Sequence, residues 1–295
     1  YHALDAYLFK LLKAGHRVAI CEQVEDPKKS KGIVRREVVE VITPGTALSD
    51  KLLEDRTHNY LVGLHADGEG YGFSAVDLST GEFTVTELRN MDEVYDELQR
   101  VNPVECVVGE TWQRERGDEI SRRFPDLIIS PRDDWTFSYD YGRDRLLEHF
   151  GTKSLKGFGC DDLSSGLCAA GAVLAYLQET QKVPLPHIRG LTFSTRSDVM
   201  VLDAATQRNL ELTASLSGDR RGTLRSVLDR TRTPMGSRLL KSWLIKPLRT
   251  VDRIRERHEA VGECVRQSSL RDDFAEGLKS CGDLERLTAR ICTGR

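Results

Sequence analysis

Several widespread functional patterns are missing from this sequence of 295 residues. Its seven cysteines are scattered, and no two form a C-x-x-C pair, which excludes a zinc ribbon and a dithiol redox site. Apolar stretches such as 167–177 are interrupted by Gly and Ala and fall short of a membrane span. No basic segment followed by an apolar one opens the chain, so nothing predicts export. We therefore expect a cytoplasmic protein with no membrane partner, and we interpret its cysteines as small hydrophobic side chains.

The net charge of the chain argues neither for nor against nucleic acid as a partner. The formal net charge is −3, and a whole-chain sum averages away the local basic patch that DNA binding requires. With 39% hydrophobic and 30% charged residues, the composition is that of a soluble globular protein of two domains or pieces of three. Residue 1 is not Met, and Arg295 falls inside an apolar-periodic run. We therefore expect both ends to be cut from a longer chain.

Residues 1–45 predict one helix and two strands separated by a basic loop. Four leucines between positions 4 and 12 share one helical face, and a short strand begins at Val18. A Val-rich strand over 34–42 ends at the breaker Thr43-Pro44-Gly45. Such a piece is too small to hold a core alone, so we expect it to be the end of a larger domain.

Residues 46–188 predict one complete α/β domain. Strands at 60–65, 71–77 and 82–87 are separated by Gly-containing turns, which indicates an antiparallel meander. Helices and strands then alternate, which implies parallel crossovers, at 91–100, 105–109, 112–123 and 127–130. Two further helices follow at 141–150 and 166–180. The order resembles the ribonuclease H-like arrangement, with a mixed sheet.

Residues 189–295 predict an all-α segment. Helices are expected at 204–212, 223–229, from Thr233-Pro234 to Pro247, at 251–264 and at 283–291. Thr233 is a favourable cap and Pro234 suits the first helical position. Apolar periodicity predicts the buried faces of the last three helices, namely Met235, Leu239, Leu240, Trp243 and Leu244, then Ile254, His258 and Val261, then Leu284, Leu287 and Ile291.

Several strings, in this order along the chain, resemble the MutS family of DNA mismatch-recognition proteins. GTLRSVLD at 222–229 and TPMGSRLL at 233–240, followed by Trp243-Leu244, resemble the start of its helical core domain, as does DAATQRNLE at 203–211. The strings VAICEQ at 18–23 and TPGT at 43–46 are similar to the second half of its mismatch-binding domain. DLSTGEF at 77–83 and LCAAG at 167–171 resemble its connector domain. The resemblance covers essentially the whole chain.

The resemblance implies a division into three segments. Residues 1–45 would be the C-terminal part of the mismatch-binding domain, 46–188 a ribonuclease H-like connector domain, and 189–295 the N-terminal part of the helical core or lever domain. For the intact protein it implies mismatched double-stranded DNA, MutL and a second copy of the chain (a homodimer) as partners, with ATP and magnesium as cofactors. The connector would relay the mismatch signal to MutL.

Two motifs that perform the family's chemistry are missing from their expected places. The family recognises a mismatch with a Phe-x-Glu motif whose Phe stacks on the mispaired base; residues 1–45 contain none, and we expect it before Tyr1. The phosphate-binding loop G-x-x-x-x-G-K-[ST] occurs nowhere in the sequence. We therefore expect a fragment that is not an enzyme, has no catalytic or metal-binding residue and no cofactor of its own, and keeps scaffold and signal-relay functions.

Two surfaces are candidates for partner contacts. The basic loop with Lys28, Lys29, Lys31, Arg35 and Arg36 can neutralise DNA phosphates, which would give salt-sensitive binding without sequence preference. The alternative, equally open, is a solvated hairpin tip. The predicted helix 141–150 leaves Asp144, Arg145 and Glu148 outward as a partner surface, although any surface helix shows this pattern.

An alternative of a different class is a metal-dependent ribonuclease H-like nuclease, which holds two metal ions with carboxylates at strand ends. The acids near suitable strand ends are Asp67, Asp77, Glu82 and Glu105. Asp67 and Glu82 lie beside glycines, where turn acids are common for backbone reasons, and Asp77 closes a strand instead of lying inside one. His65 and His187 have no positioned nucleophile, so we interpret them as surface or core histidines.

Overall fold

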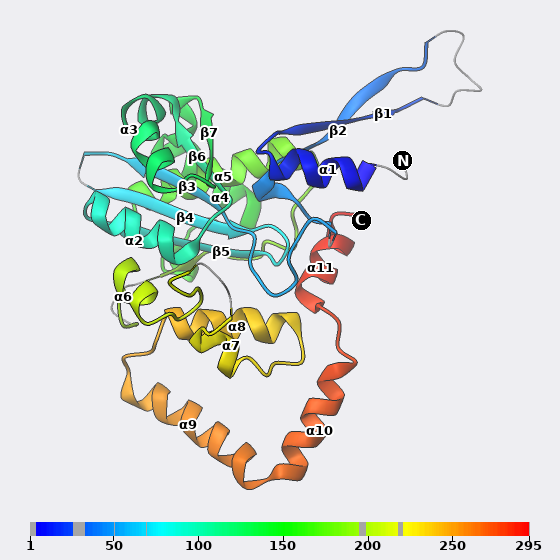
Figure 1. The fold of residues 1–295 in the computed structure, drawn as a ribbon. Helices are drawn as coiled ribbons and strands as arrows, with labels where there is room; N and C mark the ends of the chain where they lie inside the picture. Colours follow the sequence, from blue (N-terminus) through cyan, green and yellow to red (C-terminus); the bar gives the residue numbers. More distant parts are fainter. Residues whose placement is uncertain are drawn as a thin grey trace.

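The structure is a computed structural model that describes residues 4–25, 33–49, 51–68, 70–194, 199–217 and 221–294. Figure 1 shows three regions along the chain: a projecting ribbon with one helix, a layered body built on a sheet, and a set of helices, yellow to red, beside that body. We call them the first part (4–49), the α/β part (51–194) and the helical part (199–294).

The first part is a small helix-and-ribbon unit. Its elements are α1 (Leu4–Lys13), β1 (Val18–Gln23), β2 (Arg36–Ile42) and the short 3-10 turn Pro44–Thr46. β1 and β2 pair antiparallel, and their far end stands clear of the body (Figure 1). Leu8, Leu12 and Ile42 form a small cluster with Ala47. The predicted helix and strands are confirmed.

One six-stranded mixed sheet forms the centre of the α/β part. Its strands are β3 (Leu61–Ala66), β4 (Tyr71–Asp77), β5 (Glu82–Leu88), β6 (Glu105–Gly109), β7 (Ile128–Arg132) and β8 (Thr192–Phe193), in the order β7-β6-β3-β4-β5-β8. β3, β4 and β5 pair antiparallel, whereas β6 and β7 run parallel to β3. The predicted meander and parallel crossovers are therefore confirmed, and β8 is an addition that was not predicted.

Helices cover both faces of this sheet. α2 (Met91–Val101) and α3 (Glu110–Arg123) pack on one face, against side chains such as Val62 and Leu64. α4 (Tyr139–Phe150) and α5 (Ser165–Gln181) cover the other face, which includes Leu61. α5 needs small residues where its backbone lies close to that of α4, since a Cβ on Gly171 would lie 2.1 Å from the Gly142 Cα of α4. Two turns, Asp134–Phe137 and Lys156–Phe158, complete this part.

The helical part is an open frame rather than a packed bundle (Figure 1). Its helices are α6 (Ala204–Asn209), α7 (Leu224–Leu228), α8 (Pro234–Ile245), α9 (Val251–Arg266), α10 (Ser268–Lys279) and α11 (Leu284–Cys292). All the predicted helices are present, with α6 ending earlier than expected, and α10 was not predicted. Among the described residues, no helix combines the length and the apolar character needed to cross a membrane.

The predicted buried faces of the helical part are wrong for most of their residues, and the rest (Met235, Leu240, Leu244 and Ile254) are only half-buried. Leu239 and Trp243 of α8 are 53% and 40% exposed, and Ile291 of α11 is 76% exposed. Exposure also contradicts the predictions for His258, Val261, Leu284 and Leu287. The side chains that are buried instead include Arg238 and Arg286, each 2% exposed. These two helices turn their polar faces to the α/β part, because residues 54–57 of that part offer backbone carbonyls as hydrogen-bond acceptors, while Asp283 and Glu285 at the start of α11 supply the carboxylates that pair with Arg238.

The cysteines agree only in part with their interpretation as small hydrophobic side chains. All seven are free; Cys106, Cys160 and Cys168 are buried, whereas Cys21 and Cys281 are exposed. Burial raises the pKa of Cys160 and of Cys168 to about 11, so both are unreactive thiols at neutral pH.

Candidate functional site at the junction of the α/β and helical parts

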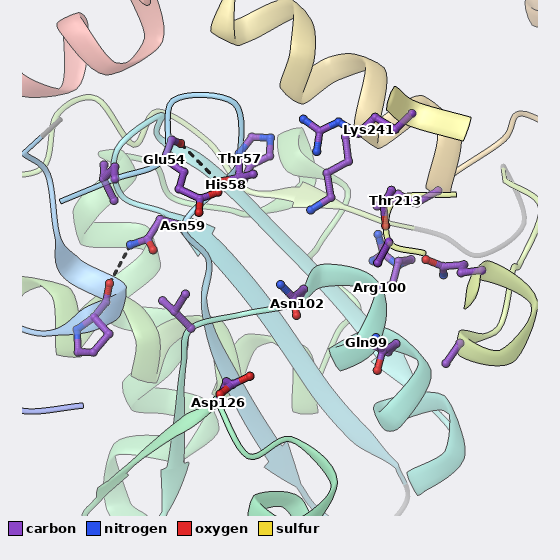
Figure 2. Close-up of a pocket in the computed structure, with 18 of the residues that line it drawn as sticks. Glu54, Thr57, His58, Asn59, Gln99, Arg100, Asn102, Asp126, Thr213 and Lys241 are labelled. Carbon is purple, nitrogen blue, oxygen red and sulfur yellow. Dashed lines mark hydrogen bonds between the residues drawn. The ribbon is translucent and has the colours of Figure 1, made fainter. Parts of the chain in front are cut away.

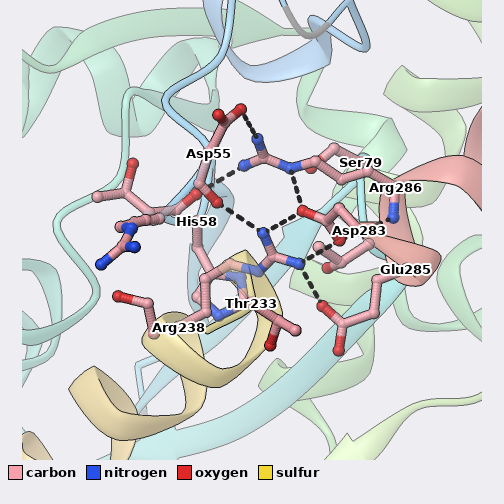
Figure 3. A network of polar contacts seen from close by, with 12 residues as sticks. Asp55, His58, Ser79, Thr233, Arg238, Asp283, Glu285 and Arg286 are labelled. Carbon is pink, nitrogen blue, oxygen red and sulfur yellow. Dashed lines mark hydrogen bonds and ion pairs between the residues drawn. The ribbon is translucent and has the colours of Figure 1, made fainter. Parts of the chain in front are cut away.

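Residues 54–57, which we call the strap, precede the first strand of the sheet and present their backbone to the helical part. Each of their four carbonyl oxygens accepts a hydrogen bond from an arginine of that part. Figure 3 shows two of these arginines, Arg238 and Arg286, on either side of Asp55 and Asp283. Arg286 Nη2 donates to Glu54 O (3.1 Å) and Thr57 O (2.7 Å), Arg238 Nη1 to Asp55 O (2.8 Å), and Arg225 Nη2 to Arg56 O (2.8 Å). All four hydrogen-bond acceptors are backbone atoms, and the Asp55 carboxylate adds only a longer ion pair to Arg286 at 3.9 Å, so the arginines bind chiefly the backbone of the strap.

Arg238 is the best-paired of the three arginines. Its side chain is 1% exposed and forms a two-pronged ion pair with Asp283, at 2.6 and 2.7 Å, and a third contact with Glu285 at 2.6 Å. Burial alone would lower the pKa of Arg238, but the hydrogen bonds that it donates to Asp283 and Glu285 raise it above its usual value. Burial would likewise raise the pKa of Asp283, and Arg238 holds it below its usual range.

Arg286 is equally buried but less completely paired. Burial lowers its pKa, and the neighbouring Arg238 charge acts in the same direction. Its Nε and Nη1 approach Asp283 and Asp55 only at 3.8 and 3.9 Å, too long for hydrogen bonds. The ion pairs of Arg286 are therefore weaker than those of Arg238.

Helix capping places both arginines. Thr233 Oγ1 accepts from Gly236 N at 3.1 Å and Pro234 occupies the first position of α8, as the sequence predicts, which sets Arg238 on the second turn. Asp283 caps α11 by accepting from Arg286 N (3.4 Å) while its carboxylate also binds Arg238. A single residue therefore fixes the start of α11 and links the two arginines.

The strap is continuous with an anchor on the sheet. Asp77, at the end of β4, is fully buried and accepts from Asn59 N at 3.2 Å, from Ser79 N at 2.9 Å and from Ser79 Oγ at 2.7 Å. His58 Nδ1 lies 2.9 Å from its second oxygen. Burial would raise the pKa of Asp77, but the hydrogen bond and charge of His58 lower it, assisted by Ser79. Asp77 therefore holds the residues that directly follow the strap.

A second buried carboxylate anchors the chain before the strap. Glu105 of β6 is 0% exposed and accepts four hydrogen bonds. The donors are Thr43 Oγ1 (2.6 Å), Gly45 N (2.9 Å), Ser130 Oγ (2.6 Å) and Tyr176 Oη (2.6 Å). Two of them belong to the turn that leaves β2, so Glu105 ties the first part to the α/β part.

These contacts leave the nuclease alternative unsupported. The carboxylates of Asp77 and Glu105 are engaged by the donors described above, Asp67 binds Ser165 Oγ, and Glu82 accepts from Tyr60 Oη at 2.9 Å. Across the described ranges, no three His, Cys, Asp or Glu side chains gather as a metal site would require. His65 and His187 are partly or fully buried, and burial lowers the pKa of both.

A large cleft borders the strap on one side. Its volume is about 1020 Å³, and it lies between the strap, α2 and the start of the helical part (Figure 2). Glu54, Thr57 and His58 line one wall, and Thr213 and Lys241 lie across from them. The strap is therefore bound by arginines while also bordering open space.

Among the residues predicted from sequence as contact sites, those that the structure describes lie away from this junction. Lys28, Lys29 and Lys31 fall outside the described residues. Arg35 and Arg36 are exposed on the projecting ribbon, and Arg35 forms an ion pair with Glu37. On α4, Asp144 and Glu148 are exposed and Arg145 is 3.4 Å from Glu148. Sequence reasoning missed Arg225, Arg238, Arg286 and the strap; the local signals were the helix caps at Thr233 and Asp283.

Fold and junction together define a multidomain chain in which buried polar contacts couple a mixed α/β layer to a helical frame. Family models for MutS domain I, MutS domain II and MutS domain III match residues 1–51, 59–189 and 205–295 respectively. The chain belongs to the MutS family.

Two curated relatives match the whole chain. It is 48% identical over 301 residues to a protein of Salinibacter ruber, and 45% identical over 298 residues to one of Symbiobacterium thermophilum. Both are named DNA mismatch repair protein MutS, and the chain spans 33% and 34% of their lengths. A Phe-x-Glu tripeptide does occur here, Phe274-Ala275-Glu276, but it lies in α10, within the segment matched to domain III and not domain I.

Proposed function

We propose that this chain is the scaffold and signal-relay segment of a DNA mismatch-recognition protein that acts in mismatch repair. The observation that supports this most directly is the match to MutS domains I, II and III in order, together with relatives named for mismatch repair. The longer protein would bind mismatched double-stranded DNA as a homodimer in the cytoplasm, with ATP and magnesium as cofactors. The segment itself would position domains and would not catalyse a reaction.

We propose the domain boundaries 1–45, 46–188 and 189–295, with 46–188 as a ribonuclease H-like connector. The strand order β5-β4-β3-β6-β7, with three antiparallel strands followed by two parallel ones, supports that arrangement. The boundaries near 46 and 189 follow the ends of the two-stranded ribbon and of the six-stranded sheet, whose last strand β8 (Thr192–Phe193) lies just past residue 188.

The central test compares the longer protein with this chain. The protein that contains this sequence should bind a duplex with one G·T mismatch more tightly than the matched duplex, as measured by fluorescence anisotropy. Residues 1–295 alone should show neither mismatch preference nor ATP hydrolysis. Mismatch selectivity or ATP turnover by the 295-residue chain would contradict the proposal, as would a longer protein that binds both duplexes equally. A plasmid-nicking assay with magnesium or manganese should show no cleavage; cleavage abolished by Asp77→Ala would restore the nuclease alternative.

Two surface contacts belong to the same proposal. Lys28, Lys29, Lys31, Arg35 and Arg36 would bind DNA phosphates, and a duplex titration at low salt should show weak binding that their alanine variants remove. On α4, Asp144, Arg145 and Glu148 would contact MutL, so charge reversal at the three positions should reduce co-precipitation with MutL. No duplex binding at low salt, or unchanged MutL capture, would remove the respective surface from the proposal.

A further inference from the structure

We propose that the strap transmits the position of the first part directly to α8 and α11, with Arg238 and Arg286 as the positioning residues that receive it. This inference rests on the proposed function, because the displacement to be transmitted is the one that mismatched DNA would impose on the first part. It assigns a path that runs along the chain from the first part to the helical part, without passing through the sheet.

The input side of this path is an apolar contact. Leu52 and Leu53, which directly precede the strap, pack against the cluster formed by Leu8 and Leu12 of α1 and by Ile42 of β2. No residue separates Leu53 from Glu54, the first strap residue. A displacement of α1 relative to the α/β part therefore moves the strap backbone by the connectivity of the chain.

The output side is a set of contacts to the backbone itself. Three arginines from α7, α8 and α11 take up the four successive carbonyls of the strap, and two of these arginines are 2% exposed. A guanidinium is planar and rigid, so a carbonyl that shifts by an ångström loses its hydrogen bond unless the arginine follows. Arg238 can follow only by carrying Asp283, and Asp283 caps α11.

The contacts and the space around the junction allow the strap to shift. Nε and Nη1 of Arg286 approach Asp283 and Asp55 only at 3.8 and 3.9 Å, which is longer than a hydrogen bond. Glu54 and Thr57 also line the cleft of about 1020 Å³, which gives the strap room to move. Meanwhile Asp77 holds Asn59 N at 3.2 Å, so a displacement is confined to residues before the sheet.

The decisive variant separates the strap from Leu53 without changing the apolar cluster on one side or the arginines on the other. Two glycines inserted between Leu53 and Glu54 leave the apolar cluster and the arginines intact but remove the mechanical link. The arginine side is tested by Arg286→Lys, which keeps the charge but replaces the rigid guanidinium, whose Nη2 donates to both Glu54 O and Thr57 O, by a shorter and flexible ammonium. Arg271→Lys on α10, where the arginine is 54% exposed, is the matched control.

The experiment uses the longer protein that contains this sequence. Hydrogen exchange of the amides in the strap, α8 and α11 is measured with a G·T-mismatched and with a matched duplex. In the parent protein and in Arg271→Lys, the mismatch should change exchange rates in these helices. In the glycine insertion and in Arg286→Lys, that difference should fall at least about fivefold, while mismatch affinity stays within about threefold of the parent.

The outcomes separate this inference from the proposed function. A glycine insertion that leaves the mismatch-dependent exchange in α8 and α11 unchanged, in a protein that still prefers the mismatch, overturns the strap as the path but not the function. A parent protein with no preference for the mismatch overturns the function and this inference with it. Should Arg286→Lys fail to fold, the insertion variant still decides, because it alters no buried side chain.

Discussion

Replacing Glu105 by Gln should weaken the attachment of the first part to the α/β part while conserving the shape of the side chain. The buried carboxylate accepts four hydrogen bonds, two at each oxygen. The amide keeps one oxygen for Thr43 Oγ1 and Gly45 N, and turns its NH₂ toward Ser130 and Tyr176, whose hydroxyls must rotate to accept. The four bonds lose their charge assistance, and at about 1 kcal/mol for each we expect a loss of about 2–4 kcal/mol.

Urea denaturation of the 295-residue chain, followed by circular dichroism, measures this loss. Glu115→Gln on the exposed face of α3 is the matched control and should remain within about 0.5 kcal/mol of the parent. Glu105→Ala should be worse than Gln, because the Gly45 N–H cannot rotate and is left without an acceptor in a buried cavity. A Gln variant as stable as the parent, or an Ala variant no worse than Gln, would refute the argument that four donors converge on a charged acceptor.

Three further changes test separate features of the fold. A Cβ on Gly72 would lie 1.8 Å from the backbone oxygen of Ser165, so Gly72→Ala should lower stability by about 3 kcal/mol or more in urea denaturation, and no loss would contradict the close packing of α5 on β4. Burial, and then the nearby Arg100 charge, lower the pKa of Lys246 to about 8 from 10.5, so the unfolded chain binds more protons between these values and stability should rise with pH across that interval. Lys246→Met should abolish this rise and add up to about 3 kcal/mol at pH 7 in a melting series; an unchanged pH profile would contradict it. The pKa of Asp283 lies below its usual range, so its stabilisation is present above about pH 4 and is lost as the pH falls further; Asp283→Asn should flatten this acid-side loss.

The elements of the α/β part could be predicted because burial leaves a regular trace in the sequence. The residues 105–109 and 71–77 are strands with the predicted limits, since strands covered on both faces are short, apolar and bounded by breakers. The two-residue strand β8 leaves no such trace. α10 was not predicted, although Leu270, Phe274 and Leu278 repeat at a spacing of four, which is typical of one face of a helix.

The candidate site could not be predicted from the sequence, because its contacts join distant positions. The strap and its arginines are separated by 169 residues or more, and local periodicity carries no information about such pairs. The apolar pattern of α8 and α11 also gave the wrong buried faces, because a prediction from that pattern assumes that the buried face of a helix is the apolar one. That assumption fails where the opposing surface is a row of backbone carbonyls, which arginine satisfies and leucine cannot.

Stability measurements can show whether the buried ion pair of Arg238 serves to stabilise the chain or to hold the strap in one position. Removing one partner of a buried ion pair costs about 3–5 kcal/mol, whereas replacing the whole pair by apolar residues is often neutral or stabilising. Arg238→Met alone should therefore destabilise the chain strongly, since it leaves the mostly buried Asp283 with only the longer ion pair to Arg286 at 3.8 Å. The combination of Arg238→Met with Asp283→Asn, which can still cap α11, and Glu285→Leu should recover most of that loss in urea denaturation, and yet fail to hold the Asp55 carbonyl. If the triple variant is no more stable than Arg238→Met, the ion pair is simply a source of stability; if it recovers, the arginines are present because they fix the path of the strap.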